Sequence, residues 1–381
     1  MNIYFDNAAT TKASAEVLEA FVSVAENNYA NAASLHMPGL EAERQIKIAK
    51  HSIGTVLGSS GDDITFTSGG TESNNLAILG TALSGTRRRI ITTKTEHPSV
   101  LEPIETLKIK GAEIIYTPID EHGVIDLEAF RQNLSVPAFV SISHVSSETG
   151  TIQPIEEIGR IISQTCQKTI FHSDGVQAFG KIKVSPQKCN IHLYSVSAHK
   201  IHGLKSIGAL YVKRGVHVNP ILFGGGQQKN LRPGTENNQL AASFQTATTT
   251  ATNSLNANYQ HALGLKKLIW EGISKSIPDA FLNGQPIETA SPYILNISFL
   301  GIRGEVLLHA LEDAGIFVST GSACSSKEAE SKTLTAMGLG QARAASAIRL
   351  SFSKHNTQHE AQHFITILRD IVPKLRLFAK G

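Results

Sequence analysis

Short runs of β-branched and aromatic residues alternate with helical patterns along the first half of this chain. The runs that we predict to be strands are residues 64–67, 89–93, 113–117, 138–143 and 169–173. Between residues 40 and 57, apolar side chains are spaced by three and four positions, at Ala42, Ile46, Ala49, Ile53 and Val56. That spacing is typical of an amphipathic helix, and Gly58 is suited to end it. Alternating strands and helices predict an α/β fold with a mainly parallel sheet covered by helices.

The pattern changes in the second half of the chain. Two further strands, 191–196 and 207–213, follow each other too closely for a helix to lie between them, so we expect the sheet to be mixed. A polar helical stretch, 237–276, is typical of a connecting helix. The remaining predicted elements are strands at 293–299, 316–319 and 347–352 and helices at 304–311 and up to residue 371. We therefore predict a large domain of residues 13–255 and a smaller α/β domain of residues 1–12 and 256–381.

The composition excludes several classes of protein. Of the 381 residues, 41% are hydrophobic and 18% are charged, which argues against disorder, and a net charge of +3 is too small and too dispersed to predict nucleic-acid binding. No apolar stretch approaches the ~18 to 20 residues of a membrane span, and the first residues lack the features of a signal peptide. Cys166, Cys189 and Cys324 are widely spaced, so a disulfide framework and a structural zinc site are poor interpretations. We expect a reducing, cytoplasmic location.

A glycine-rich turn follows the first predicted strand of the sheet. Active sites in such sheets lie at the carboxyl ends of strands, so the residues directly after strands are candidates. The strand 64–67 runs into SGGTE, Ser68 to Glu72, where Gly69 and Gly70 let the backbone approach an anion at the start of a helix. A strand-to-helix turn with two glycines also has a purely structural explanation.

Two charged residues follow later strands. Asp174 ends TIFHSD, and Lys200 follows the next strand in SVSAHKIHG. A lysine at a strand end inside a crevice can lose its solvation, which lowers its pKa and frees the amine to form a Schiff base. A nearby carboxylate could keep a pyridinium nitrogen protonated. With the glycine turn, these residues suggest pyridoxal phosphate; an exposed lysine beside an unrelated capping aspartate is the alternative.

Eight segments, spread over nearly the whole chain, match one enzyme family in order. They are YFDNAATT (4–11), TFTSGGTESNN (65–75), TEHPSV (95–100), HSDGVQAFGK (172–181), SAHKIHG (197–203), LRPGTEN (231–237), STGSACSS (319–326) and AIRLS (347–351). With these motifs the chain resembles the cysteine desulfurases, class V aminotransferase-fold enzymes that use pyridoxal phosphate. The resemblance implies the type I fold of pyridoxal-phosphate-dependent transferases, a large mainly parallel mixed-sheet domain plus a smaller α/β domain that carries the Cys324 loop.

The resemblance also implies roles for residues around the cofactor. Lys200 is similar to the lysine that binds pyridoxal phosphate as a Schiff base and later moves the Cα proton. His97 is similar to the histidine that stacks on the cofactor ring and assists proton transfer, while Asp174 would pair with the pyridine nitrogen and Gln177 with the phenolic oxygen. The implied phosphate ligands are Gly70, Thr71, Ser197 and His199, with Thr235 donated by the other subunit of a homodimer.

Cys324 lies in TGSACSS, a stretch that is typical of an exposed loop rather than a core. Free cysteines are usually buried and inert, so the residues alone do not establish a catalytic thiol. The resemblance makes Cys324 the thiolate that takes the sulfur of cofactor-bound L-cysteine as a persulfide, and Arg349 the residue that binds the substrate carboxylate. The implied reaction converts L-cysteine to L-alanine and passes the sulfur to an acceptor protein, an iron-sulfur scaffold or a tRNA-thiolating enzyme.

Ser146 and Ser147 depart from the family pattern, which commonly has two asparagines before the glutamate at Glu148. The second asparagine normally reaches the cofactor or the substrate carboxylate, and Ser147 is shorter and has no amide donor. A lost hydrogen bond to a charged group corresponds to about 1.5 to 3 kcal/mol, or roughly ten- to a hundredfold in affinity. Two other hypotheses therefore stay open: a pyridoxal-phosphate-dependent lyase or aminotransferase acting on another amino acid, and a non-enzymatic relative that takes part in sulfur transfer.

HEAQH, His359 to His363, matches the H-E-x-x-H pattern that can bind zinc on a helix. A metalloprotease of that kind needs a third ligand downstream, and only Asp370 follows. We expect no metal centre, with adventitious surface binding as the remaining alternative.

Overall fold

The computed structural model of the chain describes residues 2–82, 89–320 and 331–379. Its described strands are β1 (Ile3–Tyr4), β2 (Ile64–Thr67), β3 (Arg89–Thr92), β4 (Glu113–Tyr116), β5 (Ala138–Ser141), β6 (Ile170–Asp174), β7 (Leu193–Ser197), β8 (Gly208–Val212), β9 (Ala280–Asn283), β10 (Ile294–Phe299), β11 (Ile316–Phe317) and β12 (Ala347–Ser351). Its described α-helices are α1 (Ala15–Asn27), α2 (Met37–Val56), α3 (Gly70–Ala82), α4 (Pro98–Ile109), α5 (Leu127–Gln132), α6 (Ile155–Thr165), α7 (Asn238–Asn253), α8 (Leu255–Ser274), α9 (Gly304–Asp313), α10 (Lys332–Ala336), α11 (Gln341–Ala345) and α12 (Gln358–Ala379). A short 3₁₀ helix, η2 (Ala198–Lys200), follows β7.

The largest sheet has seven strands in the order β2-β8-β7-β6-β5-β3-β4. The strands from β7 to β4 run parallel to one another, whereas β8 is antiparallel to both β2 and β7. Each of the seven strands predicted for this part of the chain is found, with ends that differ by at most two residues. The predicted mainly parallel, mixed α/β sheet is therefore confirmed.

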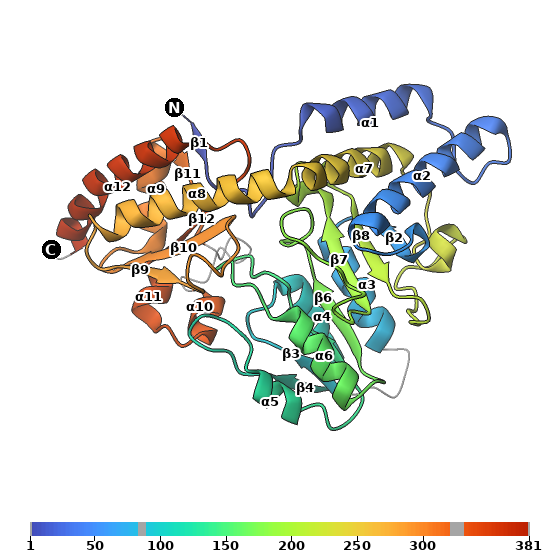
Figure 1. The fold of residues 1–381 in the computed structure, drawn as a ribbon, viewed down its shortest axis with the longest axis horizontal. Coiled ribbons are helices and arrows are strands. Elements are labelled where there is room, and N and C mark those ends of the chain that lie inside the picture. The colour runs from blue at the N-terminus through green and yellow to red at the C-terminus, as the bar shows by residue number, and fades with distance from the viewer. Residues whose placement is uncertain (1, 83–88, 321–330, 380–381) are drawn as a thin grey trace.

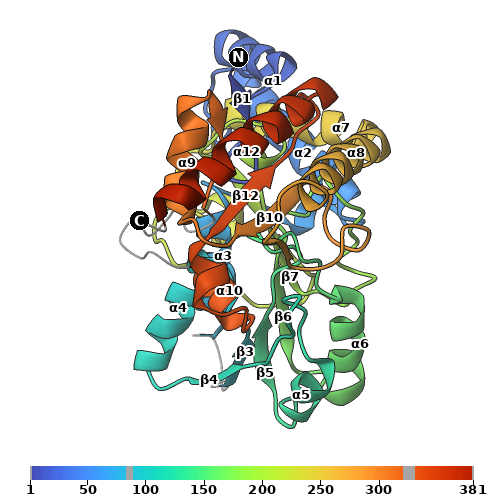
Figure 2. The same ribbon diagram turned by 90° about the vertical axis from the view of Figure 1, so that its left-hand side faces the viewer.

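Helices cover both faces of this sheet. Successive residues of a strand point to opposite faces, so Ile90 lies in the core beneath α3 and α4 and Ile91 lies in the core beneath α2, α6 and α7. On β5, Phe139 lies in the same core as Ile90, and Val140 lies in the same core as Ile91. Figure 2 shows α4 and α6 on opposite sides of the sheet. Burial on both faces explains why β3 and β5 have apolar residues at consecutive positions.

A second core surrounds the antiparallel strands β12-β10-β9 and the parallel pair β1-β11. Isolated bridges from Asp6 to Ser351 and from Ser319 to Arg349 join the pair to β12. Apolar side chains of α8 and α12, among them Ile269 and Phe364, belong to this core. Both ends of the chain lie in this unit, so the first residues pack against the last third of the sequence (Figure 1).

We propose that residues 13–255 form the large domain and that residues 1–12 with 256–381 form the small one, and the separate hydrophobic cores support this division. The predicted connecting helix is instead two helices, α7 and α8, which meet at Ser254. The threonines and asparagine that precede Ser254 lower helix propensity there.

Short elements escape prediction from the sequence. α10 and α11 have five residues each, which is too short for a helical hydrophobic period to show, and β9 is a four-residue strand at the edge of its sheet. Within the described ranges, no helix has the length and apolar character needed to cross a membrane.

Candidate active site

The carboxyl ends of three strands meet at one edge of the seven-stranded sheet. Thr67 at the end of β2 lies opposite Gly208, and Gly208 lies opposite Ser197 at the end of β7. Asp174 ends the neighbouring strand β6, and Lys200 follows β7 within η2. Candidate residues from separate segments are thus brought to one edge, as expected for this kind of sheet.

The turn between β2 and α3 packs closely against this edge. A Cβ atom on Gly208 would lie 2.7 Å from the backbone of Gly69, so only glycine permits this approach. A Cβ atom on Gly70 would lie 2.8 Å from a methyl group of Val176 in its present position. The nearby hydroxyl of Ser197 is buried and has no hydrogen-bond partner among the described residues. A buried donor beside a helix N-terminus is suited to bind an anion.

Thr71, in the first turn of α3, and Thr235 are both exposed. Thr235 lines a cavity of about 320 Å³ that Ser68 and Arg232 also line. The Arg232 guanidinium forms a 2.9 Å salt bridge to Glu72 in the first turn of α3. Thr235 thus lies near the glycine turn of its own chain. The contribution of Thr235 to the phosphate site of a second subunit stays a prediction.

His97 immediately precedes α4 and caps its N-terminus. Its Nδ1 atom accepts a hydrogen bond from the backbone N–H of Ser99 at 3.1 Å and lies 2.7 Å from the Ser99 hydroxyl. Because a backbone N–H can only donate, Nδ1 is unprotonated and the ring carries its proton on Nε2. Burial lowers the pKa of His97, although the Asp174 carboxylate acts in the opposite direction. His97 is therefore held as a neutral ring in one tautomer.

Asp174 is buried and held through both carboxylate oxygens. Its Oδ2 accepts from the side-chain amide of Asn74 at 2.8 Å, and its Oδ1 accepts from the backbone N–H of Val176 at 3.0 Å. The same Asn74 amide donates to the Ser99 hydroxyl at 2.8 Å, which links Asp174 to His97. Sequence reasoning misses Asn74 and Ser99, and its only signal for them is that they stand inside matching motifs.

The amine of Lys200 donates to the carbonyl oxygens of Ala8 and Ala9 at 2.5 and 2.6 Å. Gln177 donates from Nε2 to the same Ala8 oxygen at 2.9 Å, so Gln177 and Lys200 share an acceptor. Both alanines belong to the matching segment YFDNAATT. Because an alanine side chain is apolar, the sequence does not reveal that the backbone carbonyls of Ala8 and Ala9 accept hydrogen bonds from site residues. The first residues of the chain therefore form one wall of the site.

His199 lies beside Lys200 and faces the same N-terminal segment. Its Nδ1 atom is 3.1 Å from the Thr10 hydroxyl, and its backbone carbonyl accepts from the Thr11 hydroxyl at 2.8 Å. Burial, followed by the charge of Lys200, lowers the pKa of His199 to about 4. The ring is neutral and already engaged with Thr10, and its role as a phosphate ligand stays a prediction.

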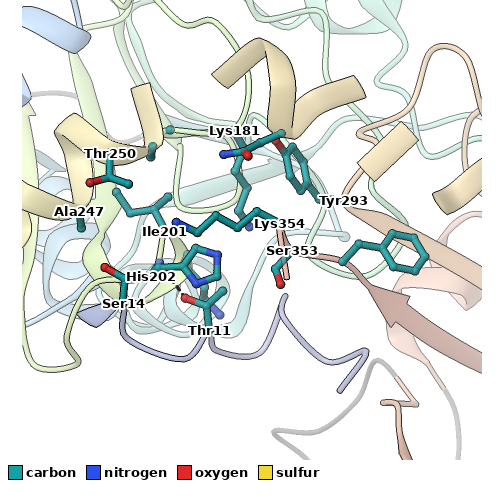
Figure 3. A pocket seen from close by; sticks show the side chains of 15 residues that line it. Thr11, Ser14, Lys181, Ile201, His202, Ala247, Thr250, Tyr293, Ser353 and Lys354 are labelled. Carbon is teal, nitrogen blue, oxygen red and sulfur yellow. Dashed lines mark hydrogen bonds between the residues drawn. The ribbon is translucent and has the colours of Figure 1, made fainter. Parts of the chain in front are cut away.

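A small cavity borders Lys200, and Figure 3 shows its wall. Its volume is about 40 Å³, and it is lined by Lys181, His202, Tyr293 and Lys354, among other residues. A cavity of this size has room for a water molecule or two and none for a cofactor.

Arg349 on β12 is almost fully buried and is held through two of its three nitrogens. Its Nη2 forms a 2.7 Å salt bridge to Asp6, and its Nη1 donates to the backbone carbonyl of Ser147 at 2.9 Å. Its Nε is buried without a hydrogen-bond partner among the described residues. The carbonyl of Ser147 makes the contact, so replacing asparagine by serine at this position does not displace Arg349.

The turn around Ser147 is tied to α10. The Ser146 hydroxyl accepts from the backbone N–H groups of Glu148 at 3.3 Å and Thr149 at 3.2 Å, which closes the turn. Burial raises the pKa of the Glu148 carboxyl, and Glu148 accepts a hydrogen bond from Ser331, the residue that caps α10. Cys324, the predicted sulfur-accepting thiol, lies outside the described residues.

The H-E-x-x-H segment has a structural role at the start of α12. Glu360 accepts from the backbone N–H of Thr357 at 2.7 Å, and the Thr357 hydroxyl accepts from the N–H of Glu360 at 3.2 Å, which is a capping box. In the described parts of the chain, no group of three or more histidine, cysteine, aspartate or glutamate side chains is placed to hold a metal ion.

The site fits pyridoxal phosphate by the chemistry of its donors and acceptors. Each oxygen of Asp174 accepts one described hydrogen bond and has the capacity for another, as pairing with a pyridinium would require. Lys200 supplies an amine, and Gln177 supplies an N–H next to it. The buried Ser197 hydroxyl is costly without a partner, and a phosphate at the glycine turn would satisfy it.

Comparison with known proteins agrees with this chemistry. The family described as Aminotransferase class-V matches residues 3–364, so the chain belongs to this family of pyridoxal-phosphate-dependent enzymes. Within the family it is similar to proteins named cysteine desulfurases. It is 37% identical over 98% of its length to "Cysteine desulfurase IscS" of Dictyoglomus turgidum, of which the match covers 95%. It is likewise 37% identical over 98% of its length to the protein of that name from Methanosarcina thermophila, of which 93% is covered.

Solved structures show the same relationship. A "NifS-like protein" superposes with a TM-score of 0.92 at 36% identity, covering 98% of this chain and 100% of the other. The structure named "SspA in complex with cysteine" has a TM-score of 0.80 at 30% identity and covers 93% and 100%. The predicted type I transferase fold is therefore confirmed.

Proposed function

We propose that this chain converts L-cysteine to L-alanine and transfers the sulfur to Cys324. The observation that carries the proposal is the assembly of Lys200, Asp174 and a tautomer-locked His97 at one sheet edge. Its cysteine desulfurase relatives, and the cysteine named for the SspA structure, support L-cysteine as the substrate.

Each residue has a chemical task that follows from its surroundings. When bound, pyridoxal phosphate withdraws electrons from the substrate Cα. The Asp174 carboxyl group, held by Asn74 and the Val176 N–H, is placed to pair with a pyridinium nitrogen. The Lys200 amine, once it leaves the carbonyls of Ala8 and Ala9, can take the Cα proton. His97 can offer its Nε2–H and nothing from Nδ1.

Arg349 is placed to bind the substrate carboxylate. Its Nε has no described partner, and its Nη2 is held by the Asp6 carboxylate, which a substrate carboxylate would replace or share. The Ser147 carbonyl keeps the other end of the guanidinium fixed. Arg349 is therefore oriented before substrate arrives, which lowers the entropic cost of binding.

Sulfur transfer completes the proposed reaction. The Cys324 thiolate attacks the substrate sulfur, the bond between sulfur and carbon breaks, and the carbon keeps the electron pair and gains a proton to give alanine. The persulfide on Cys324 then passes its outer sulfur to an acceptor, an iron-sulfur scaffold or a tRNA-thiolating enzyme. Because Cys324 must stay a free thiol, and not part of a disulfide, to attack the substrate sulfur, we propose a cytoplasmic location.

A homodimer is part of this proposal. Large apolar side chains are exposed near α2 and in the loop after β8: Tyr29 (77%), Leu35 (93%), Met37 (67%) and Phe223 (88%). Exposed apolar surface of this kind supports an interface, and we propose that a second copy of the chain covers it and that Thr235 reaches the phosphate across it.

The test is alanine formation from L-cysteine by the purified, cofactor-loaded protein with a reductant and no other protein. We expect alanine and sulfide in equal amounts, and Cys324→Ala should retain cofactor absorption while losing reductant-dependent sulfide release. Cys166→Ala and Cys189→Ala, which remove free cysteines elsewhere in the chain, are the matched controls and should keep both products. No alanine from a cofactor-loaded wild type would contradict the proposal.

A further inference from the structure

We propose that Lys181 is a positioning residue that fixes the orientation of the Gln177 side-chain amide beside Lys200. None of the expected roles involves Lys181, although it stands at the end of the matching segment HSDGVQAFGK. The inference rests on the proposed function, since the Gln177 amide matters there only when the cofactor is bound.

Lys181 is buried and contacts Gln177 directly. Its Nζ donates to Gln177 Oε1 at 2.9 Å, and it lies over the Tyr293 ring, 5.7 Å from the centroid (Figure 3). Its pKa is lowered to about 7 by burial and then by the charges of Lys200 and Arg349. Lys181 is thus a buried amine that stands within the electrostatic reach of the Schiff-base lysine.

The contact decides which way the Gln177 amide points. The Lys181 amine, which carries N–H donors in either protonation state, donates to the amide oxygen; a carbonyl can only accept, so the atom facing Ala8 is the amide nitrogen. Both ends of the amide therefore agree on one orientation. Without Lys181, the hydrogen bond to Ala8 would be the only described side-chain contact that holds the amide.

This orientation places the N–H group of Gln177 next to the Lys200 amine. Gln177 Nε2 and Lys200 Nζ share the Ala8 carbonyl as acceptor. A ligand bound to Lys200 would therefore find the N–H of Gln177, and not its carbonyl oxygen, beside its own oxygen atoms. A donor to the phenolic oxygen favours its ionised form and lowers the pH at which the bound cofactor changes its absorption. Lys181 therefore acts on the cofactor through Gln177.

Visible absorption of the bound cofactor, titrated with pH, tests this inference. Lys181→Met should raise the midpoint by about one pH unit, the size expected when a hydrogen bond to a charged group is lost. Lys266→Met is the matched control, because Lys266 is also buried, its pKa is also lowered to about 7 by burial, and it donates to the Ser291 carbonyl at 2.8 Å instead. It should lower thermal stability and leave the midpoint unchanged.

A double-mutant cycle separates action through Gln177 from other effects. In a Gln177→Ala background, Lys181→Met should add nothing to the midpoint. An unchanged midpoint in Lys181→Met, an equal shift in both backgrounds, or the same shift in Lys266→Met would each overturn the inference. If Lys181→Met does not fold, Lys181→Gln, which is one bond shorter and keeps a polar end, makes the same test. A wild type that binds no pyridoxal phosphate would overturn the proposed function and this inference with it; a loaded wild type with an unresponsive Lys181 variant overturns the inference alone.

Discussion

His97 Nδ1 accepts from the backbone N–H of Ser99 at 3.1 Å and lies 2.7 Å from the hydroxyl of the same residue. The hydroxyl itself accepts from the Asn74 amide, so its own hydrogen is available for the His97 ring. Ser99 therefore connects the tautomer of His97 to the Asn74 amide that also holds Asp174. Two groups with different proposed tasks share one hydrogen-bond chain.

We expect Ser99→Ala to raise the pKa of His97, because a donor to Nδ1 stabilises the neutral ring and its removal favours the protonated one. Turnover should fall roughly two- to tenfold, which corresponds to the net value of one hydrogen bond, about 0.5 to 1.5 kcal/mol. Histidine ¹⁵N chemical shifts measured against pH report the pKa. Ser73→Ala is the control, since Ser73 is another buried serine, on α3, and its hydroxyl forms a hydrogen bond with that of Thr67. A change in the pKa of His97 in that variant would contradict the assignment.

Lys200→Ala should abolish covalent fixation of pyridoxal phosphate by borohydride. The amine that is positioned by Ala8 and Ala9 would be gone, and turnover should fall by on the order of 10²- to 10⁴-fold, as expected when a proton-transfer group is lost. Mass spectrometry of reduced, digested protein locates the label. Lys205→Ala, an exposed lysine nearby, should label as the wild type does. A label that persists elsewhere in Lys200→Ala would show that another lysine carries the cofactor.

The buried His172 predicts a loss of stability in acid. It lies between the hydroxyls of Ser141 at 2.9 Å and Ser195 at 3.0 Å, and burial lowers its pKa to about 3. The unfolded chain takes up this proton below about pH 6.5 and the folded chain does not until about pH 3, so its contribution to stability is lost as the pH falls between these values. From pH 7.5 to pH 5 the loss is about 2 kcal/mol.

The variant His172→Gln removes this titration. When the pH falls from 7.5 to 5, the free energy of unfolding of the wild type should therefore decrease by about 2 kcal/mol more than that of the variant. Urea titrations at the two pH values measure the difference, in which the other titrating groups cancel. His359→Gln, an exposed position on α12, should keep a constant difference from the wild type. A constant difference for His172→Gln as well would show that its burial does not govern its protonation.

The fold is accessible from the sequence because its strands are buried on both faces and therefore stand out as short β-branched runs. The same reasoning finds Asp174 and Lys200, since each follows a strand. It misses Asn74, whose partner Asp174 is 100 positions away, and it misses Ala8, which lies 192 positions from Lys200. Those contacts depend on how helices and the N-terminal segment pack on the finished sheet, which no local pattern specifies.

The Ser147 position tests substrate binding. The backbone carbonyl of Ser147 accepts the hydrogen bond from Arg349, so Ser147→Asn should keep this hydrogen bond. The new side chain should add an amide donor near the substrate carboxylate. We expect KM for L-cysteine to fall about tenfold, with kcat nearly unchanged, because a hydrogen bond to a charged group contributes about 1.5 to 3 kcal/mol. Initial rates of alanine formation at varied L-cysteine give both constants. Ser146→Asn is the control: its side chain can keep capping the N–H groups that the serine hydroxyl now accepts from, so KM should stay unchanged. An unchanged or higher KM in Ser147→Asn would mean that the side chain at this position does not reach the substrate, and that Arg349 alone holds the carboxylate.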